Sequence, residues 1–221
     1  MDRALRPLIR ARPHDLVRLA DPDEILAGTE PAWVGTALAA APWAVIRRAR
    51  APAGHLATGV RGPARHQRHA MLIPAAAAAG IARPEDLRPP ASVVAPETPA
   101  LAALRECRPI LDGLGRPWGP TGSAGFELAT GRPATTQASD LDLLIRVGTL
   151  AGFTHAAALA SQLSSMPARV DCYLETRHGA VALAELATHP DKIVLRTSDG
   201  PRLVTLEQAM RSEPPGVGDR P

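Results

Sequence analysis

The 221-residue sequence lacks the features that mark a membrane or secreted protein. No apolar run approaches the roughly 18–20 residues that span a bilayer, and no hydrophobic segment follows the charged start Met1–Arg6 as it would in a secretory signal. The two cysteines, Cys107 and Cys172, fit neither a zinc-binding pattern nor a disulfide framework. These absences predict a cytoplasmic protein with reduced, half-buried thiols and no membrane partner.

Lysine is also scarce, because Lys192 is the only lysine among 25 basic side chains. The net charge is only +3, and the arginines are spread along the chain, whereas a nucleic-acid-binding protein concentrates its basic residues on one element. Hydrophobic residues make up 45% of the sequence, which is enough to build a packed core. We therefore expect a folded protein without a nucleic-acid partner.

A proline-rich segment divides the chain into two expected domains. Residues 83–98 hold several prolines and few large apolar residues, which predicts an extended linker. The expected N-terminal domain covers residues 12–85, and the expected C-terminal domain covers residues 98–208. Strand and helix patterns mix in both. The expected fold class is therefore α/β (α+β), in which strands and helices are mixed. A small mixed N-terminal domain is expected to precede a mixed-sheet domain.

The expected elements follow from hydrophobic periodicity and from turn and capping residues. The N-terminal domain is expected to hold strands at 43–47 and 56–61, a helix at 30–40 and helical turns in the Ala-rich segment 74–82. In the C-terminal domain we expect a helix capped by Thr98 and stopped at Gly115, strands at 126–129, 140–147 and 169–175, a helix at 154–166, and short elements at 180–187, 193–197 and 202–210.

Two aspartates in the segment Ser139–Leu143 are the strongest chemical signal. Alternate side chains of a strand share one face, so Asp140 and Asp142 point the same way, about 7 Å apart along the backbone. Two such carboxylates can converge on divalent cations, and their oxygen ligands favour Mg²⁺. The chemistry that needs this arrangement is phosphoryl or nucleotidyl transfer. We therefore predict a catalytic Mg²⁺ site at Asp140 and Asp142.

A third carboxylate, Asp171, belongs to the strand-like segment 169–175, in which apolar and polar residues alternate. The helix expected at 154–166 is long enough to join two parallel neighbouring strands. If strand 169–175 lies beside strand 140–147, Asp171 faces the same cations as a base or a third ligand. Asp171 is therefore the third predicted catalytic residue.

A glycine-rich segment precedes the aspartates. Residues 119–125 offer small side chains and backbone N–H groups that can approach phosphate oxygens. The segment is not a P-loop, because no Gly-Lys-Ser/Thr follows. An Asp-x-Asp pair alone is more often a solvated strand edge than a site. Its combination with Gly122, Ser123 and a later strand-borne Asp171 is much rarer and favours a functional site.

These motifs resemble those of a known superfamily. Gly122-Ser123 followed by Asp140-x-Asp142 resembles the signature of the polymerase-β-type nucleotidyltransferases. The longer runs Trp118–Gly131, Ser139–Leu143 and Arg169–Thr176 are similar to a narrower family, the malonate decarboxylase holo-acyl-carrier-protein synthases, also called phosphoribosyl-dephospho-CoA transferases. The N-terminal half resembles this family too, at Arg12–Leu16, Pro42-Trp43 and Val60–Pro63, so the resemblance covers roughly residues 12–208.

The resemblance implies a reaction. The donor is 2′-(5″-triphosphoribosyl)-3′-dephospho-CoA, and the acceptor is a serine of the acyl-carrier subunit of malonate decarboxylase. The serine attacks the phosphate next to the ribose, and pyrophosphate leaves. By this resemblance the C-terminal domain is nucleotidyltransferase-like, Asp140 and Asp142 bind Mg²⁺, and Gly122 and Ser123 hold the donor's triphosphate.

Two arginines of the N-terminal domain are further candidates for donor binding. Arg61 and Arg65 lie in the basic segment 60–68, and guanidinium groups suit phosphate oxygens. The alternative interpretation is an arginine-rich solvated loop.

Two other functions stay open on the sequence. One is a nucleotidyltransferase with a different acceptor, such as a small molecule, an RNA end or another protein. The other is an inactive relative that only binds a carrier protein. Retained carboxylates argue against the inactive relative, because mutually repelling acids have no role in a site without catalysis.

Overall fold

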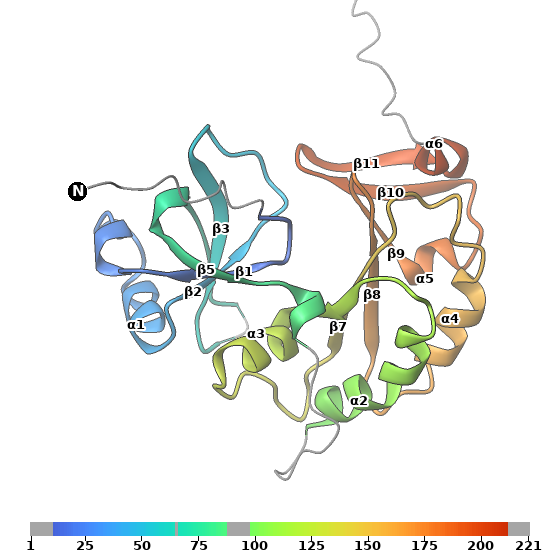
Figure 1. The fold of residues 1–221 in the computed structure, drawn as a ribbon, viewed down its shortest axis with the longest axis horizontal. Coiled ribbons are helices and arrows are strands. Elements are labelled where there is room, and N and C mark those ends of the chain that lie inside the picture. Colours follow the sequence, from blue (N-terminus) through green and yellow to red (C-terminus); the bar gives the residue numbers. More distant parts are fainter. Residues whose placement is uncertain (1–10, 65, 88–97, 212–221) are drawn as a thin grey trace, which may run out of the picture. The chain divides into compact units, whose positions relative to one another are not determined.

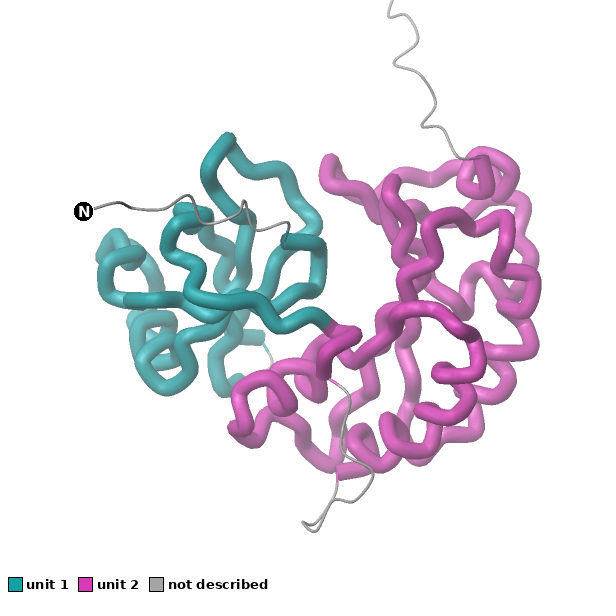
Figure 2. Tube along the Cα trace, viewed as in Figure 1, with its two compact units in different colours: residues 1–83 teal, residues 84–221 magenta. Residues whose placement is uncertain are grey.

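The computed structural model describes residues 11–64, 66–87 and 98–211. The chain divides into two compact units, residues 1–83 and residues 84–221 (Figure 2). Each unit has its own β-sheet (Figure 1) and its own cluster of buried apolar side chains. The predicted α+β organisation is confirmed.

The N-terminal unit is built on a five-stranded antiparallel sheet in the order β4-β3-β2-β1-β5. Helix α1 packs on it, because Val34 and Leu38 join the buried cluster of strand residues. The strands are β1 (Leu16–Leu19), β2 (Trp43–Ile46), β3 (His55–Arg61), β4 (Arg68–Pro74) and β5 (Ala78–Ala82), and the helical elements are α1 (Ala32–Ala40) with the 3₁₀ turns η1 (Asp23–Ile25) and η2 (Ala75–Ala77).

The Ala-rich segment 74–82 is mostly extended rather than helical. Only residues Ala75–Ala77 form a 3₁₀ turn, and Ala78–Ala82 form β5. Ala82 and Ile81 lie opposite Leu16 and Val17 of β1 in the antiparallel ladder. Alanine has the highest intrinsic helix propensity, but the pairing of this short segment with β1 overrides that preference.

The C-terminal unit contains a six-stranded mixed sheet in the order β11-β10-β9-β8-β7-β6. Strands β7 and β8 are parallel, and the other neighbouring strands are antiparallel. The strands are β6 (Trp118–Pro120), β7 (Leu141–Arg146), β8 (Val170–Glu175), β9 (Ala180–Ala182), β10 (Lys192–Thr197) and β11 (Gly200–Thr205). The helical elements are η3 (Pro84–Asp86), α2 (Pro99–Asp112), α3 (Gly122–Thr130), α4 (Ala156–Leu163), α5 (Leu183–Leu186) and α6 (Leu206–Met210).

One face of this sheet is covered by helices, and the other carries polar side chains. Leu141, Leu143 and Ile145 of β7 share a core with apolar residues of α2, α4 and α5. The alternating residues Asp142 and Arg146 point to the opposite face, as the period of two in a strand requires. Leu144 lies between them on that face and is buried, so the polar residues of this face flank an apolar one.

Part of the expected linker is folded. Pro84–Asp86 form η3, and both Pro84 and Leu87 are buried, so this end of segment 83–98 packs on the C-terminal unit. Gly119 of β6 is the contact point, since a β-carbon there would lie 1.7 Å from the carbonyl oxygen of Pro84. Residues 88–97 lie outside the described residues.

We expect Gly119→Ala to lower the free energy of unfolding by about 1–3 kcal/mol, because the added carbon must displace backbone rather than a flexible side chain. Thermal unfolding measures this as a lower Tm. Gly80→Ala in β5 is the matched control, since no atom lies within 4 Å of its added carbon. A Gly119→Ala protein as stable as the Gly80→Ala protein would contradict the contact.

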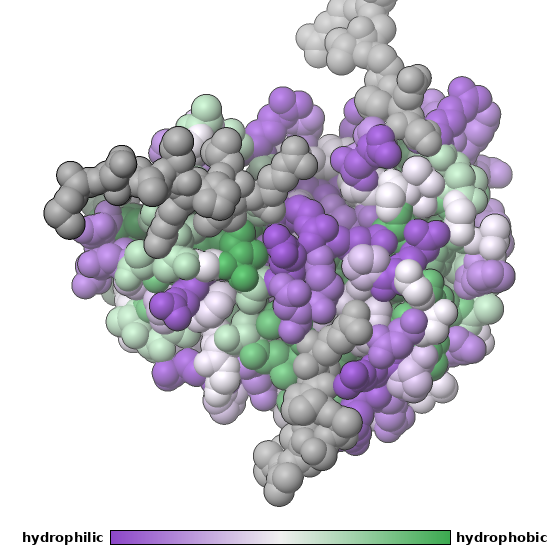
Figure 3. Space-filling model, in the orientation of Figure 1, coloured by the Kyte–Doolittle hydropathy of each residue, from purple (hydrophilic) through white to green (hydrophobic). Residues whose placement is uncertain are grey.

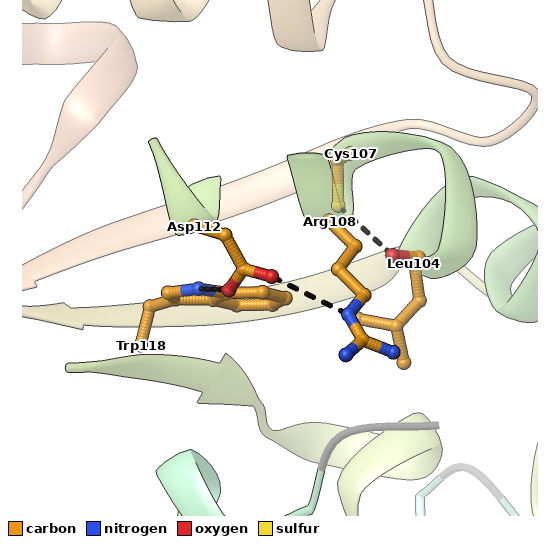
Figure 4. Close-up of polar contacts among 5 residues, drawn as sticks. All are labelled: Leu104, Cys107, Arg108, Asp112 and Trp118. Atoms are coloured by element: carbon orange, nitrogen blue, oxygen red, sulfur yellow. Dashed lines mark hydrogen bonds and ion pairs between the residues drawn. The ribbon is translucent and has the colours of Figure 1, made fainter. Parts of the chain in front are cut away.

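Trp118 anchors β6 to helix α2 (Figure 4). Its ring is 1% exposed, and its indole N–H donates to Asp112 Oδ1 over 2.9 Å. Arg108 Nε lies 3.4 Å from the other oxygen of the same carboxylate. A buried indole with its N–H satisfied fixes a short strand firmly. The glycine-rich turn that follows β6 thus starts from a rigid position.

None of the helices formed by the described residues has the length and apolar character of a bilayer-crossing helix. On the face drawn in Figure 3, hydrophobic residues lie in small groups among hydrophilic ones. Single exposed apolar residues such as Leu203 are ordinary on folded proteins.

Candidate active site

The turn between β6 and α3 carries the glycine-rich motif. The backbone N–H of Thr121, the N-cap residue of α3, donates to the carbonyl oxygen of Asp142 over 2.8 Å. The N–H of Gly125 donates to the carbonyl oxygen of Thr121 over 3.0 Å. Gly122 has a φ of +59°, a left-handed conformation that glycine adopts without steric cost. The first of these bonds attaches the turn to β7, and the second closes the first turn of α3.

The segment Phe126–Ala129 is helical, so the prediction of a strand there is wrong. It lies inside α3, which ends at Thr130 before Gly131, a glycine with a φ of +69°. A left-handed glycine at this position is a common helix terminator, and the prediction treats it instead as a turn after a strand. The correction places Gly122 and Ser123 in the first turn of a helix. Backbone N–H groups and the helix dipole favour negative charge there.

The carboxylate of Asp142 lies directly against this first turn. A β-carbon at Gly122 would lie 1.9 Å from Asp142 Oδ2 and 2.8 Å from its Cγ. Any side chain at position 122 would therefore push the carboxylate away. Glycine at this position leaves the space that the carboxylate occupies.

Asp171 lies opposite Asp142 in the parallel register of β7 and β8. Neighbouring strands are about 4.8 Å apart, so the two side chains leave the same face of the sheet side by side. The predicted neighbourhood of these strands is confirmed. Arg169 Nε and Nη2 donate to Asp171 Oδ1 over 3.2 and 2.9 Å. Two carboxylates thus lie on neighbouring strands, and Arg169 forms hydrogen bonds with one of them, Asp171.

Asp140 and Ser123 complete the predicted set. Asp140 is partly buried and lies one residue before β7 begins, and Ser123 is buried in the first turn of α3. No group of three or more Asp, Glu, His or Cys side chains suited to a metal ion is found among the described residues. Mg²⁺ often takes only one or two protein carboxylates and completes its shell with water and substrate phosphates. A pair of carboxylates such as the predicted Asp140 and Asp142 is compatible with that mode of binding.

A cavity of about 340 Å³ opens beside the first half of β8. Its lining includes Arg169, Asp171 and Tyr173 from β8 and its approach, together with residues of α4 and Leu183. Strand β9 pairs with β8 only from Tyr173 onwards, which leaves the edge of Val170–Cys172 beside this cavity. The cavity thus lies at the open edge of β8, on the side where α4 and Leu183 pack against the sheet.

Glu127 of α3 ties down the loop that leads to Asp140. Its Oε2 accepts hydrogen bonds from the backbone N–H of Ala134, the N–H of Thr135 and the hydroxyl of Thr135, over 2.9, 2.8 and 2.7 Å. The hydroxyl of Thr98 donates in turn to that of Thr135 over 2.9 Å. Burial opposes ionisation of Glu127, but the three hydrogen bonds outweigh it and lower the pKa of its carboxyl.

We expect Glu127→Gln to lose roughly 1 kcal/mol of stability at neutral pH, because neutral hydrogen bonds replace charge-assisted ones. The folded-state pKa lies below the unfolded one, so this stabilisation is present above the ordinary glutamate pKa. It is lost as pH falls through the lowered pKa. Thermal unfolding between pH 7 and 3 should show the gap between wild type and variant closing on acidification. Glu106→Gln, an exposed change on α2, is the control, and a gap that is constant with pH would contradict the prediction.

The candidate residues of the N-terminal unit belong to β3 and its following turn. Arg61 is the last residue of β3, lies opposite Arg68 of β4 and is partly buried. Arg65 lies outside the described residues. Donor binding by these arginines stays a prediction.

Both cysteines are buried and unpaired by disulfide. Burial raises the pKa of the Cys107 thiol to about 12, and burial also raises the pKa of the Cys172 thiol. The Cys107 thiol donates to the carbonyl oxygen of Leu104 over 3.4 Å (Figure 4). The predicted role as reduced filler residues agrees with this placement.

Sequence reasoning misses two residues near the site. Glu127 falls in the segment predicted as a strand, and reading Gly131 as a helix terminator is the signal that would have placed it on α3. Arg196 lies in the predicted strand 193–197 with no local motif around it. Its place on the sheet follows only from long-range strand pairing.

Comparison with known proteins covers nearly the whole chain. Residues 86–207 match the family model "Phosphoribosyl-dephospho-CoA transferase MdcG C-terminal domain", and residues 12–84 match the corresponding N-terminal domain. No solved structure matches the chain.

Curated relatives bear the same name. A phosphoribosyl-dephospho-CoA transferase of Pseudomonas syringae pv. tomato is 41% identical over 193 residues, which cover 87% of this chain and 91% of the relative. One of Azotobacter vinelandii is 42% identical over 200 residues, with 87% and 92% covered. One of Pseudomonas aeruginosa is 41% identical over 192 residues, with 87% and 91% covered. The chain therefore belongs to the phosphoribosyl-dephospho-CoA transferase family, a family of transferase enzymes.

Proposed function

We propose that the protein transfers the phosphoribosyl-dephospho-CoA group from 2′-(5″-triphosphoribosyl)-3′-dephospho-CoA to a serine of the malonate decarboxylase acyl-carrier subunit. The serine oxygen bonds to the phosphorus next to the ribose, the bond from that phosphorus to the bridging oxygen breaks, and pyrophosphate leaves. Under this proposal the C-terminal unit is a nucleotidyltransferase of the polymerase-β type. The observation that carries the proposal is the pairing of Asp142 with Asp171 beside the first turn of α3.

The chain's own residues take separate parts in this reaction. Gly122 and Ser123, at the start of α3, present backbone N–H groups to the triphosphate. Asp142 and Asp140 are the residues that would hold Mg²⁺. Bound Mg²⁺ neutralises charge that develops on the phosphates. Asp171, oriented by Arg169, is the candidate acceptor of the serine proton.

The placement of the carboxylates supports the proposed binding of a cation. A triphosphate and two carboxylates repel one another, so the site needs a cation to hold them together. The first turn of a helix also favours the phosphates beside Asp142. Mild positive net charge is compatible with docking of an acidic carrier protein.

The direct test is intact mass spectrometry of the carrier subunit after incubation with enzyme, donor and Mg²⁺. We expect the carrier to gain the mass of the phosphoribosyl-dephospho-CoA group, and EDTA to abolish the gain. A carrier with its acceptor serine changed to alanine is the control. No adduct from a verified donor would overturn the proposal.

The same experiment separates the alternative acceptors and donors. ATP in place of the donor should leave the carrier unmodified. An adenylyl adduct formed as fast with ATP would instead indicate a nucleotidyltransferase of broader donor range.

A further inference from the structure

The polar face of the C-terminal sheet continues beyond the carboxylate pair. Along β8 the residues on this face are Asp171, Tyr173 and Glu175, each about 7 Å from the next. Glu175 lies opposite Arg146 of β7 and opposite Ala180 of β9, and Ala180 lies opposite Arg196 of β10. Arg196 therefore belongs to the same face as the catalytic carboxylates.

Arg196 is held by the ring of Tyr173. The Cζ atom of its guanidinium lies 4.7 Å from the centre of that ring, within the range of a cation–π contact. Both side chains are partly buried, and Tyr173 lies two residues after Asp171, on the same face of β8. The ring thus fixes the guanidinium of Arg196 beside Tyr173, which is the next residue after Asp171 on this face of β8.

The hydrogen-bonding capacity of Arg196 is not used up by its surroundings. Its Nη1 atom is buried and has no hydrogen-bond partner among the residues that the structure describes. A buried donor without an acceptor is unfavourable, so a ligand oxygen there gains a bond that the protein does not supply. Arg146, in the same row, bonds Glu85 through its Nε over 3.1 Å, and its Nη1 atom, like that of Arg196, is a buried donor that makes no hydrogen bond to the described residues.

We infer that Arg196, oriented by Tyr173, binds phosphate oxygens of the donor. A planar guanidinium matches two phosphate oxygens at once, and stacking on a ring fixes its plane. Opposite Asp142 and Asp171, a polyphosphate needs a positive group to compensate the repulsion. The inference rests on the proposed function for the identity of the ligand. Two parts of the donor offer this chemistry, the triphosphate and the diphosphate of the dephospho-CoA moiety.

The chain contains one tyrosine, so Tyr173 is a unique reporter. Protein labelled with 3-fluorotyrosine should give a single ¹⁹F resonance. Titrations with inorganic pyrophosphate and with dephospho-CoA, each at fixed Mg²⁺, then report binding beside this ring without any turnover. We expect a saturable shift with the ligand that corresponds to the bound part of the donor.

Arg196→Ala should raise the apparent Kd for that ligand by about tenfold or more, since charge-assisted hydrogen bonds are lost. Arg196→Lys should raise it less, because it keeps the charge and loses the planar fork. Arg202→Ala, an exposed change on the neighbouring strand β11, is the control and should bind as wild type does. Urea unfolding checks that each variant folds, and Arg196→Lys carries the test if Arg196→Ala does not.

The two ligands decide the source of the phosphate. An effect on pyrophosphate alone assigns Arg196 to the triphosphate, and an effect on dephospho-CoA alone assigns it to the diphosphate. A wild-type resonance unmoved by both ligands, or equal affinities in wild type and the Arg196 variants, would overturn the inference. Carrier modification is measured separately, so an enzyme that modifies the carrier while the Arg196 variants bind normally disproves only this inference.

Discussion

Asp142→Asn is expected to lower the rate of transfer to the carrier by about a thousandfold, which corresponds to roughly 4 kcal/mol of lost transition-state stabilisation. The amide keeps the shape of the side chain beside Gly122 but removes the charge that binds a cation. Asp142 and Asp171 leave adjacent strands side by side, so the substitution also removes a repulsion between carboxylates. The variant should therefore unfold at a Tm equal to or above that of wild type.

The measurement is the initial rate of adduct formation by intact mass spectrometry, together with thermal unfolding. Asp191→Asn, an exposed change before β10, is the control and should leave both quantities unchanged. A loss of rate with a gain in stability is the signature of an active-site carboxylate. A wild-type rate in Asp142→Asn would remove the carboxylate pair from catalysis and favour a carrier-binding role.

Gly122→Ala should lower the transfer rate about a hundredfold, because small displacements of catalytic groups have effects of this size. The added carbon would lie 1.9 Å from Asp142 Oδ2, so the carboxylate must move. The left-handed backbone adds a cost of about 1–2 kcal/mol to folding for any residue with a β-carbon.

Gly131→Ala separates these two effects. Gly131 ends the same helix with a φ of +69°, and no atom lies within 4 Å of its added carbon. The Gly131→Ala enzyme should lose a similar amount of folding stability and keep the wild-type transfer rate. Adding Asp142→Ala to Gly122→Ala should recover part of the lost stability, because the displaced carboxylate is gone. Equal rates in the Gly122→Ala and Gly131→Ala enzymes would contradict the contact.

The carboxylate pair was predictable because its geometry is local. Alternation along two short strands and a helix between them are enough to place Asp142 and Asp171 on one face, and the parallel register agrees. The contact of Asp142 with Gly122 was not predictable in this way. It depends on β6 lying beside β7, with Pro120 opposite Leu143, and no sequence period reports such a pairing.

The errors in the predicted elements have a common cause. Phe126–Ala129 and the Ala-rich segment are short, and a short run satisfies helical and extended patterns equally well. Packing then decides: α3 buries Ser123 and Ala124, whereas Ala78–Ala82 complete a ladder with β1. Arg196 and Tyr173 come together because β9 pairs with β8 on one side and with β10 on the other. Long-range pairing of this kind is invisible in the residues themselves.

The burial of both cysteines has a practical consequence for assays. Dephospho-CoA ends in a pantetheine thiol of ordinary acidity, whereas burial keeps the Cys107 and Cys172 thiols protonated at neutral pH. A fluorescent maleimide should therefore label a modified carrier and leave the folded enzyme unlabelled. The fluorescence of the carrier band on a gel then measures the number of transferred groups at each time point, without purification of the product.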